Sequence, residues 1–406
     1  MNRLLVAIAL AVVAAFAAAW FLEGDAARVG WLGELFLRAL KMLIVPLVMF
    51  SMIAGITALG DVRRLGRLGG RTVGFYLLTS LIAVVVGTLL VNVVRPGDGV
   101  DASAAVTTDP VMDKGGLGVV DLILGFVSDN VVASMANLDL LPIIVFSLAF
   151  GAAVSTLGER GAPLVAFFDA GNAAMMRLVH WLMYLAPLGI FGLVAGRFGE
   201  AMAAGGRDAF VAELSAVGWY VFTVLAGLAI HAMVVTPLLL WGLTRRSPLA
   251  YARGMGKALL TAFGTASSSA TLPLTLDGVT EDNGVDRRAA EFVLPLGATV
   301  NMDGTALYEA VAAIFIAQAL GVDLTLGQQV LVVLTATLAA IGAAGIPEAG
   351  LVTMVIVLQA VGLPLEGVGL VLAVDWLLDR FRTAVNVWGD AVAAAVMERH
   401  GLAPPS

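Results

Sequence analysis

Long, mostly apolar stretches recur along this chain, and their length constrains the fold more than any other feature. A helix needs roughly 20 such residues to cross the hydrocarbon core of a bilayer. Stretches of this kind lie at residues 4–22, 31–59, 72–94, 119–157, 163–196 and 214–243. The fourth and fifth are longer than a single crossing requires, so we expect them to be broken or strongly tilted. The first is too long for the apolar core of a cleavable signal and is predicted to be a spanning helix.

Composition points to lipid as the main solvent. The chain is 60% hydrophobic and only 13% charged, which is about half the charged fraction of an average soluble protein. A soluble fold cannot bury that much apolar surface, so the sequence predicts an all-α polytopic membrane protein. The net charge of −7 offers no basic surface for nucleic acid, and the absence of cysteine excludes disulfides and thiolate metal sites. The three histidines are scattered without metal-binding spacing.

Basic residues predict the orientation, because cytoplasmic loops are enriched in lysine and arginine. One cluster lies between the second and third stretches, and another follows the sixth; the members are Arg63, Arg64, Arg67, Arg71, Arg245, Arg246, Arg253 and Lys257. Placing both clusters inside also places the N-terminus inside. We therefore expect a multi-pass protein of a bacterial-type inner (plasma) membrane, with both termini cytoplasmic and an extracytoplasmic loop at 95–117.

The last third of the chain contains two apolar stretches with small, Gly- and Pro-containing centres. The first is interrupted at residues 264–273 and the second at 342–350, and such residues weaken a continuous helix. We predict two re-entrant hairpins, at about 258–286 and 330–363. Irregular backbone at membrane depth is tolerated only where protein or a polar cavity surrounds it. The alternative is a pair of ordinary kinked helices.

An uninterrupted helix is predicted after each hairpin, at about 289–318 and 366–397. The flanking basic residues indicate that the two hairpins enter from opposite sides, which gives an inverted repeat. Such a pair of interrupted segments is the strongest sequence indication of a transporter's binding site. The complete prediction is eight transmembrane helices plus two hairpins.

Polar residues gather on one face of the last predicted helix. Within an arc of roughly 100° lie six of them, namely Asp375, Asp379, Arg382, Thr383, Asn386 and Asp390. Intramembrane ionisable groups cost several kcal/mol and need a partner or a function. One alternative is purely structural, since Asp379 and Arg382 are spaced to pair with each other.

The other predicted helix contains Asn301, Thr305 and Glu309 on one face, because they are four residues apart. Asp303 and Gly304 lie where a break in the helix could expose main-chain carbonyls. Carboxylate, amide and carbonyl oxygens are the hard ligands that an alkali cation prefers. Four such side chains are available for a cation site: Asp303, Asp390, Asn301 and Asn386.

These motifs resemble the glutamate/aspartate transporter family of dicarboxylate/amino acid:cation symporters over nearly the whole chain. The specific segments are Ser267-Ser268-Ser269-Ala270-Thr271-Leu272-Pro273, Asn301 to Glu309, Gly345-Ile346-Pro347 and Asp379 to Asp390. Weaker support comes from Lys41 to Leu47 and from Tyr76 to Ser80. Glu309, Arg380 and Ala266 resemble the animal excitatory amino acid transporters more than the archaeal homologues.

The resemblance implies a substrate pocket for an acidic amino acid. Arg382 would bind the side-chain carboxylate, Asp379 the ammonium with help from Thr383, and Asn386 the α-carboxylate. The remaining contacts would come from Ser267, Ser268, Ser269, Met302, Thr305, Ile346 and Gly350.

The resemblance also implies coupling ions, with no resident cofactor. One sodium site would use Gly297, Asn301, Asn386 and Asp390, and another would use Tyr76, Thr79, Ser80, Asn301 and Asp303. A third would consist of main-chain oxygens of Thr299, Ala340, Ile341 and Ala343. Glu309 would carry a proton, because burial favours the neutral form of a carboxyl. Glu348, at the second hairpin, departs from the acid-free tip that relatives usually have.

By the same resemblance, the chain would be a homotrimer working by an elevator mechanism in the bilayer. The scaffold would comprise residues 1–71 (helices 1–2) and 118–197 (helices 4–5). The transport domain would comprise 72–94 (helix 3) and 198–406, and 95–117 would be a loop.

Sodium- and proton-coupled uptake of glutamate or aspartate is therefore the leading prediction, and the chain is not expected to be an enzyme. A C4-dicarboxylate:cation symporter is the nearest alternative, but it would leave Asp379 without an ammonium partner. Arg382 disfavours a neutral amino acid carrier for the mirror-image reason. An ion channel with two re-entrant loops, and an intramembrane aspartyl protease using Asp303 and Asp390, are the alternatives from other classes.

Overall fold

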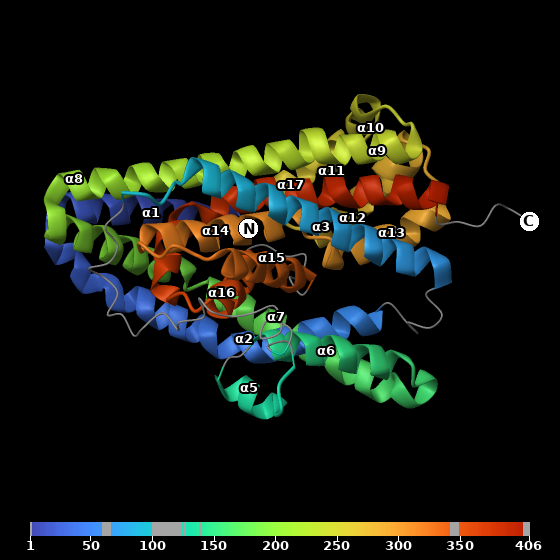
Figure 1. The fold of residues 1–406 in the computed structure, drawn as a ribbon, viewed down its shortest axis with the longest axis horizontal. Coiled ribbons are helices and arrows are strands. Elements are labelled where there is room, and N and C mark those ends of the chain that lie inside the picture. The colour runs from blue at the N-terminus through green and yellow to red at the C-terminus, as the bar shows by residue number, and fades with distance from the viewer. Residues whose placement is uncertain are drawn as a thin grey trace, which may run out of the picture.

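A computed structural model describes residues 2–58, 66–99, 124, 127–137, 140–341 and 349–400 of the chain. Within these ranges the chain is almost wholly helical and contains no strand (Figure 1). The prediction of an all-α fold is confirmed. The predicted tip of the second hairpin, with Ala343, Ile346 and Glu348, lies outside the described residues.

The first three apolar stretches each form one helix with bounds close to those predicted. These are α1 (Asn2–Leu22), α2 (Gly30–Ala58) and α3 (Gly66–Val94), and a short 3₁₀ turn, η1 (Glu23–Val29), joins the first two. The fourth and fifth stretches are broken, as expected from their length. They comprise α5 (Val131–Asn137), α6 (Leu140–Ser155), η3 (Gly158–Gly161), α7 (Ala162–Met183) and the start of α8 (Ala186–Ile230).

Helix α8 consists of two limbs that meet at Gly206. This residue has φ 66° and ψ −150°, a conformation that only glycine adopts readily. Arg197 and Glu213, on either side of the bend, form an ion pair. A straight helix would hold residues with this spacing about 24 Å apart, so the second limb must fold back along the first (Figure 1).

The two limbs of α8 contact different parts of the chain. On the first limb, Gly196 lies against Gly30 of α2, and Gly192 lies against Gly33. On the second limb, Gly227 lies against Leu307 and Leu90 of α3. Helix α8 therefore packs against α2 through its first limb and against α3 through its second limb.

The second limb continues into a π-helical turn, η4 (His231–Val235), and then α9 (Thr236–Thr244) and α10 (Pro248–Gly254). The first predicted hairpin follows as α11 (Gly256–Thr265) and α12 (Ser268–Asp277), which contact each other. Ala266 between them has a left-handed φ of 50°, and the extended Ser267 caps α12 by accepting a hydrogen bond from the Ala270 amide at 3.1 Å. A π-helical turn, η5 (Gly278–Asp282), ends this hairpin.

The next helix corrects a prediction. Residues 289–318 were expected to be uninterrupted, but they form α13 (Arg287–Val300) and α14 (Asp303–Ala319), separated by non-helical Asn301 and Met302. The physical reason is a tertiary partner: the Asn386 side-chain oxygen accepts from the Gly304 amide at 2.8 Å. This bond satisfies one of the free N–H groups that a new helix start creates.

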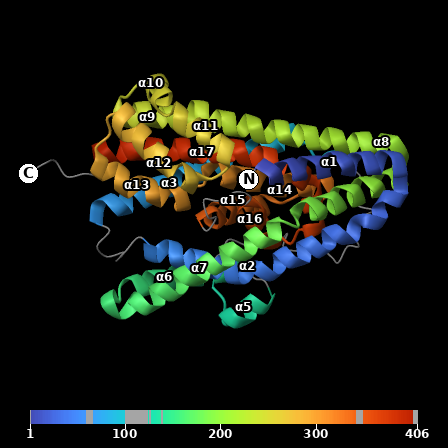
Figure 2. The same cartoon turned by 180° about the vertical axis from the view of Figure 1, so that it is seen from behind.

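The second hairpin is represented by α15 (Leu326–Ile341) and α16 (Ala349–Ala360), which contact each other. A 3₁₀ turn, η6 (Leu365–Gly367), precedes the final helix α17 (Val368–His400). Helix α17 is buried along most of its length and packs against α8, α11, α13 and α14 (Figure 2). A polar stripe on this helix is therefore held inside protein.

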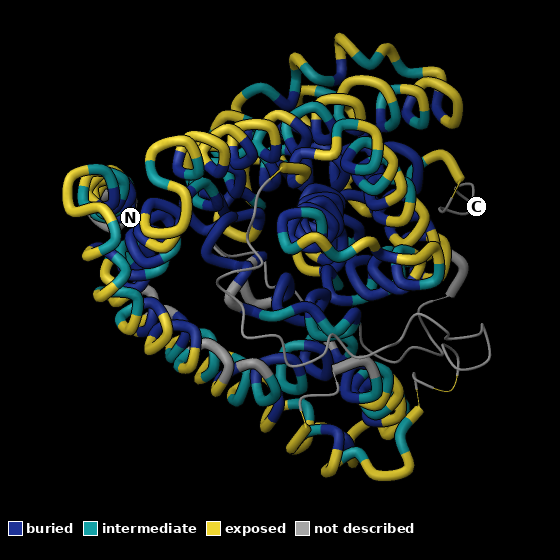
Figure 3. The backbone as a smooth tube through the Cα atoms, turned by 60° about the vertical axis from the view of Figure 1, so that its left-hand side comes forward, coloured by how far each residue is buried: buried dark blue, intermediate teal, exposed yellow. Residues whose placement is uncertain are grey.

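Several helices have the dimensions of membrane spans. Among the described residues, the stretches Val6–Ala39, Leu68–Val94, Ala186–Thr244 and Arg287–Ala319 are long and apolar enough to cross a bilayer. Exposed residues lie mainly on the outer faces of the bundle (Figure 3). Large apolar side chains such as Leu10, Leu89 and Trp219 are among them, as expected for surfaces that face lipid.

Candidate substrate and cation site

The guanidinium of Arg382 lies at the centre of the polar stripe on α17. Its side chain is 0% exposed, and its Nη2 atom lies 3.0 Å from Asp375 Oδ1 and 2.9 Å from Asp379 Oδ1. The guanidinium carbon lies 3.9 Å from the centre of the Tyr308 ring on α14, which is a favourable cation–π geometry. Two acids and one aromatic ring thus hold the cation in place.

Arg382 retains hydrogen-bonding capacity in this arrangement. Its Nε and Nη1 atoms are buried and have no hydrogen-bond partner among the described residues. A carbon added at Gly350 of α16 would lie 2.5 Å from Nη1, so the start of α16 covers this side of the guanidinium. A buried donor without an acceptor costs about 1–3 kcal/mol or more when charged, and a planar guanidinium matches a carboxylate. The geometry suits an anionic ligand.

Asn386 joins α17 to the start of α14. Besides accepting from the Gly304 amide, its Nδ2 atom lies 3.2 Å from Met302 Sδ and 3.4 Å from Thr305 Oγ1. Thr383, one turn earlier, donates to the Asp379 carbonyl at 2.8 Å. The helix break at 301–302 therefore brings Met302, Thr305 and Asn386 together, as the sequence-based pocket requires.

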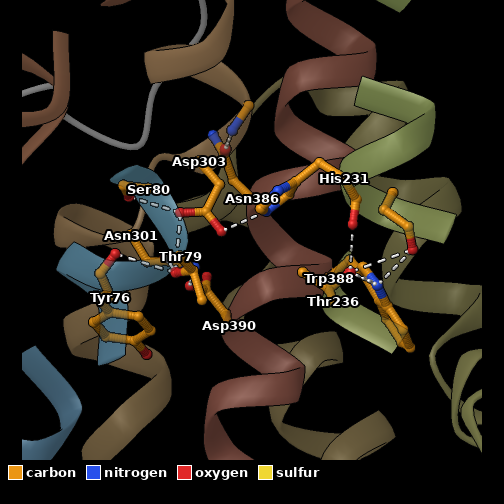
Figure 4. Close-up of polar contacts among 12 residues, drawn as sticks. Tyr76, Thr79, Ser80, His231, Thr236, Asn301, Asp303, Asn386, Trp388 and Asp390 are labelled. Atoms are coloured by element: carbon orange, nitrogen blue, oxygen red, sulfur yellow. Dashed lines mark hydrogen bonds and ion pairs between the residues drawn. The ribbon is translucent and has the colours of Figure 1, made fainter. Parts of the chain in front are cut away.

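A second polar cluster surrounds Asp303, the first residue of α14 (Figure 4). Its Oδ1 atom accepts from Ser80 Oγ at 2.6 Å and from Thr79 Oγ1 at 3.2 Å, both on α3. Thr79 Oγ1 also lies 3.4 Å from the Asn301 side-chain oxygen. Five predicted cation ligands, Tyr76, Thr79, Ser80, Asn301 and Asp303, are all almost fully buried.

The Asp303 cluster is connected to Asp390 on α17. Asn301 donates through Nδ2 to Asp390 Oδ1 at 2.9 Å, and the Tyr76 hydroxyl donates to the Val293 carbonyl at 2.9 Å. A carbon added at Gly297 would lie 2.5 Å from the Tyr76 hydroxyl and 2.7 Å from Asp390 Cγ. The residues of the first two predicted sodium sites thus form one continuous region of oxygen atoms.

The hairpin serines lie beside α17. Ser267 and Ser268 are buried and Ser269 is exposed, at the start of α12, which packs against α17. Arg380 Nη1 donates to the Phe263 and Gly264 carbonyls at 2.9 Å each. Arg380, which is not part of the polar stripe on α17, thus binds the end of α11.

Comparisons with known proteins identify the family of this chain. The pattern describing the "Sodium:dicarboxylate symporter family" matches residues 3–400. The chain belongs to this family. The resemblance seen in the sequence motifs is therefore confirmed. With its long apolar helices, this symporter is a multi-pass membrane transporter.

Similar proteins include several animal transporters. An excitatory amino acid transporter of Caenorhabditis elegans is 43% identical, covering 91% of this chain and 81% of the relative. Excitatory amino acid transporter 3 of Oryctolagus cuniculus is 43% identical, with 90% and 78% covered. Excitatory amino acid transporter 1 of Ambystoma tigrinum is 41% identical, with 91% and 77% covered.

Glu309 lies on α14 and directly follows Tyr308, whose ring packs against the Arg382 guanidinium. It is 0% exposed, and neither carboxyl oxygen has a hydrogen bond of normal geometry within the described parts of the symporter. The predicted proton carrier is therefore shielded from water, next to a residue that contacts Arg382.

The third predicted sodium site is described only in part. Thr299 is exposed near the end of α13, whereas Ala340 is buried and Ile341 is half-buried at the end of α15. Helices α13 and α15 contact each other. Ala343 lies outside the described residues, so this set of ligands remains a prediction.

Three residues of the site were not identified from the sequence. Asp375 was recognised on the stripe but given no role, and Tyr308 was read only as part of a motif. His231, whose Nε2 lies 3.0 Å from Asp303 Oδ2, was considered only for metal-binding spacing. A single histidine in a long apolar stretch was the available signal, because an intramembrane ionisable group requires a partner.

Proposed function

We propose that this symporter drives the uptake of acidic amino acids, glutamate or aspartate, with sodium and a proton as coupling ions. The observation that carries the proposal is Arg382, a fully buried arginine with two donor atoms that lack an acceptor among the described residues. An acidic side chain would supply the missing acceptor atoms. The names of the animal relatives agree with this substrate class.

The charges around Arg382 favour an amino acid over a C4-dicarboxylate. Asp375 and Asp379 already pair with the guanidinium. A dicarboxylate would add two further negative charges to a buried site and bring no positive charge. An acidic amino acid carries an ammonium group, which the acids can bind, so the cost of burying unpaired charge is smaller.

The Asp303 region supplies the cation chemistry. Hydroxyl, amide and carboxylate oxygens converge there, and such ligands suit sodium. Among the described residues, no group of three His, Asp or Glu side chains could hold a metal ion. Sodium, with its lower charge, would use the mixed oxygen set of Tyr76, Thr79, Ser80, Asn301 and Asp303. A second ion would use Gly297, Asn301, Asn386 and Asp390.

Glu309 would carry the proton. Ionising a fully buried carboxyl with little hydrogen bonding costs several kcal/mol, so the residue favours crossing the membrane in its protonated form. Tyr308, the residue before Glu309, packs its ring against the Arg382 guanidinium. Binding of substrate to that arginine would alter the electrostatic environment of the carboxyl.

Movement by an elevator mechanism in a homotrimer is part of the same proposal. The scaffold would comprise α1, α2, α5, α6, α7 and the start of α8 up to residue 197. The transport domain would comprise α3, the rest of α8 and the helices from α9 to α17. The bend at Gly206 lies close to the point where the chain passes from one group to the other. Gly196 on the first limb contacts α2, and Gly227 on the second limb contacts α3 and α14, which supports this division.

Uptake into proteoliposomes tests the proposal. Sodium, proton and potassium gradients are imposed one at a time, with radiolabelled L-glutamate, L-aspartate or succinate outside. An inward sodium gradient is expected to drive saturable accumulation of the amino acids above equilibrium. Accumulation of succinate instead would favour the dicarboxylate alternative. Flux without uphill accumulation would indicate a channel.

A further inference from the structure

His231 contacts a residue of the proposed sodium site but has no role in the proposal so far. Its side chain is 0% exposed, and its Nε2 atom lies 3.0 Å from Asp303 Oδ2. The other carboxylate oxygen, Oδ1, takes the hydroxyls of Ser80 and Thr79. Figure 4 shows the imidazole and the two hydroxyls on different sides of the carboxylate. The two oxygens of Asp303 thus have separate partners.

The direction of this hydrogen bond follows from the acceptor. A carboxylate that binds a cation is ionised and can only accept, so in the cation-binding form of Asp303 the hydrogen lies on Nε2. The other ring nitrogen, Nδ1, is buried and has no hydrogen-bond partner among the described residues. The interaction with Asp303 is therefore the polar contact that orients the ring. In return, it fixes the rotation of the carboxylate, leaving Oδ1 directed at the hydroxyls of α3.

A π-helical turn directly after α8 carries His231. His231 begins η4, whose wider turn leaves main-chain carbonyls that need other donors. Thr236 Oγ1 donates to the His231 carbonyl at 3.0 Å, and Trp388 Nε1 of α17 lies 2.7 Å from Thr236 Oγ1 and 3.1 Å from the Ala232 carbonyl. A tryptophan next to the Asp390 region thus stabilises the turn that presents the histidine (Figure 4).

We propose that His231 is a positioning residue of the sodium site, holding the Asp303 carboxylate in the orientation that binds the cation. Residues that hydrogen-bond to metal ligands typically change metal affinity by about 10- to 100-fold when they are replaced. This inference rests on the proposed sodium coupling. It adds that the sodium affinity of the α3 and α14 site depends on a hydrogen bond from η4.

Sodium-induced thermal stabilisation of the purified, full-length symporter tests the inference. The melting temperature is followed against sodium concentration in detergent without amino acid, with choline chloride keeping the ionic strength constant. His231→Leu removes the donor, whereas His231→Gln carries an amide nitrogen that reaches about as far as Nε2. His400→Gln, at the end of α17, is the matched histidine control.

The expected result is a rise of about 10-fold or more in the half-saturating sodium concentration for His231→Leu. The Gln variant and the His400 control should stay close to wild type, and the affinity for L-aspartate at saturating sodium should not change. If His231→Leu does not fold, His231→Asn, whose amide is too short to reach Asp303, must show the same shift.

Two outcomes would overturn the inference. One is an unchanged sodium dependence in the Leu or Asn variant, even with a lower melting temperature without sodium, because that indicates packing alone. The other is an equal shift in the Gln variant, because that indicates shape rather than the hydrogen bond. A wild-type protein that sodium does not stabilise would instead contradict the proposed function itself.

Discussion

Gly297 offers a sharp test of the cation region, because a single added carbon would enter it. The residue lies on α13, one turn before the helix break at Asn301. An alanine Cβ would lie 2.5 Å from the Tyr76 hydroxyl oxygen and 2.7 Å from Asp390 Cγ. Real Cβ atoms essentially never come within 3.0 Å of such atoms, so both groups must move in the Gly297→Ala variant.

The magnitude follows from the bond that would be strained. Asp390 Oδ1 accepts from Asn301 Nδ2 at 2.9 Å, and displacing the carboxylate lengthens or breaks this bond. A hydrogen bond to a charged group contributes about 1.5–3 kcal/mol. Because each 1.4 kcal/mol is a factor of about ten in affinity, Gly297→Ala should weaken sodium binding by roughly 10- to 100-fold.

The assay is the sodium concentration that gives half-maximal amino acid uptake in proteoliposomes, together with the sodium-induced thermal shift. Gly218→Ala, in the second limb of α8, is the control, since an added carbon there meets no atom within 4 Å. The control is expected to keep the wild-type sodium dependence. Equal sodium affinity in the Gly297→Ala variant and the wild type would refute the reasoning, because Asp390 and Tyr76 would then not form the site.

Three further predictions concern separate parts of the molecule. Replacing Glu309 by Gln should abolish the pH dependence of net uptake, and an unchanged pH profile would rule out its role as proton carrier. Arg382→Lys should lower uptake of acidic amino acids by about 10- to 100-fold, since charged hydrogen bonds are lost, while the sodium-induced thermal shift is retained; loss of both would indicate misfolding. In the loop before α13, hydrogen bonds from Arg288 hold the pKa of Asp286 below its usual value, so its stabilisation is present above the unfolded-state pKa of about 4 and is lost as the pH falls through the lower folded-state pKa. The Asp286→Ala variant should therefore have a lower melting temperature than wild type at pH 7, and this difference in melting temperature should narrow below about pH 4. A difference that stays constant with pH would show that Asp286 does not stabilise the fold through its lowered pKa.

Much of the fold could be predicted because membrane spans have a required length. The bounds of α1, α2 and α3 follow from apolar runs that match the bilayer, and the polar stripe of α17 follows from helical periodicity alone. The break between α13 and α14 does not follow from apolar length, and the sequence only suggested it at Asp303 and Gly304. It depends on Asn386, which lies 82 positions from Gly304 in sequence and satisfies its amide.

The candidate site was predicted more completely than its supporting contacts. Asp379 and Arg382 pair as their spacing suggests, but Asp375 shares the same guanidinium, and spacing does not indicate which acid is nearest. The proposed role of His231 depends on the π-helical turn η4, which the sequence pattern does not predict. Its partner Asp303 belongs to another helix, so only the packing of α3, η4 and α14 brings them together.

The most direct test of the central claim is the affinity for L-aspartate measured by calorimetry across a range of sodium concentrations. The Arg382 pocket and the Asp303 region share Asn386 and the break before α14, so each ligand should stabilise the arrangement that the other needs. The account predicts that affinity rises steeply with sodium, and that Asp303→Asn weakens this dependence. An affinity for L-aspartate that is the same with and without sodium would contradict it.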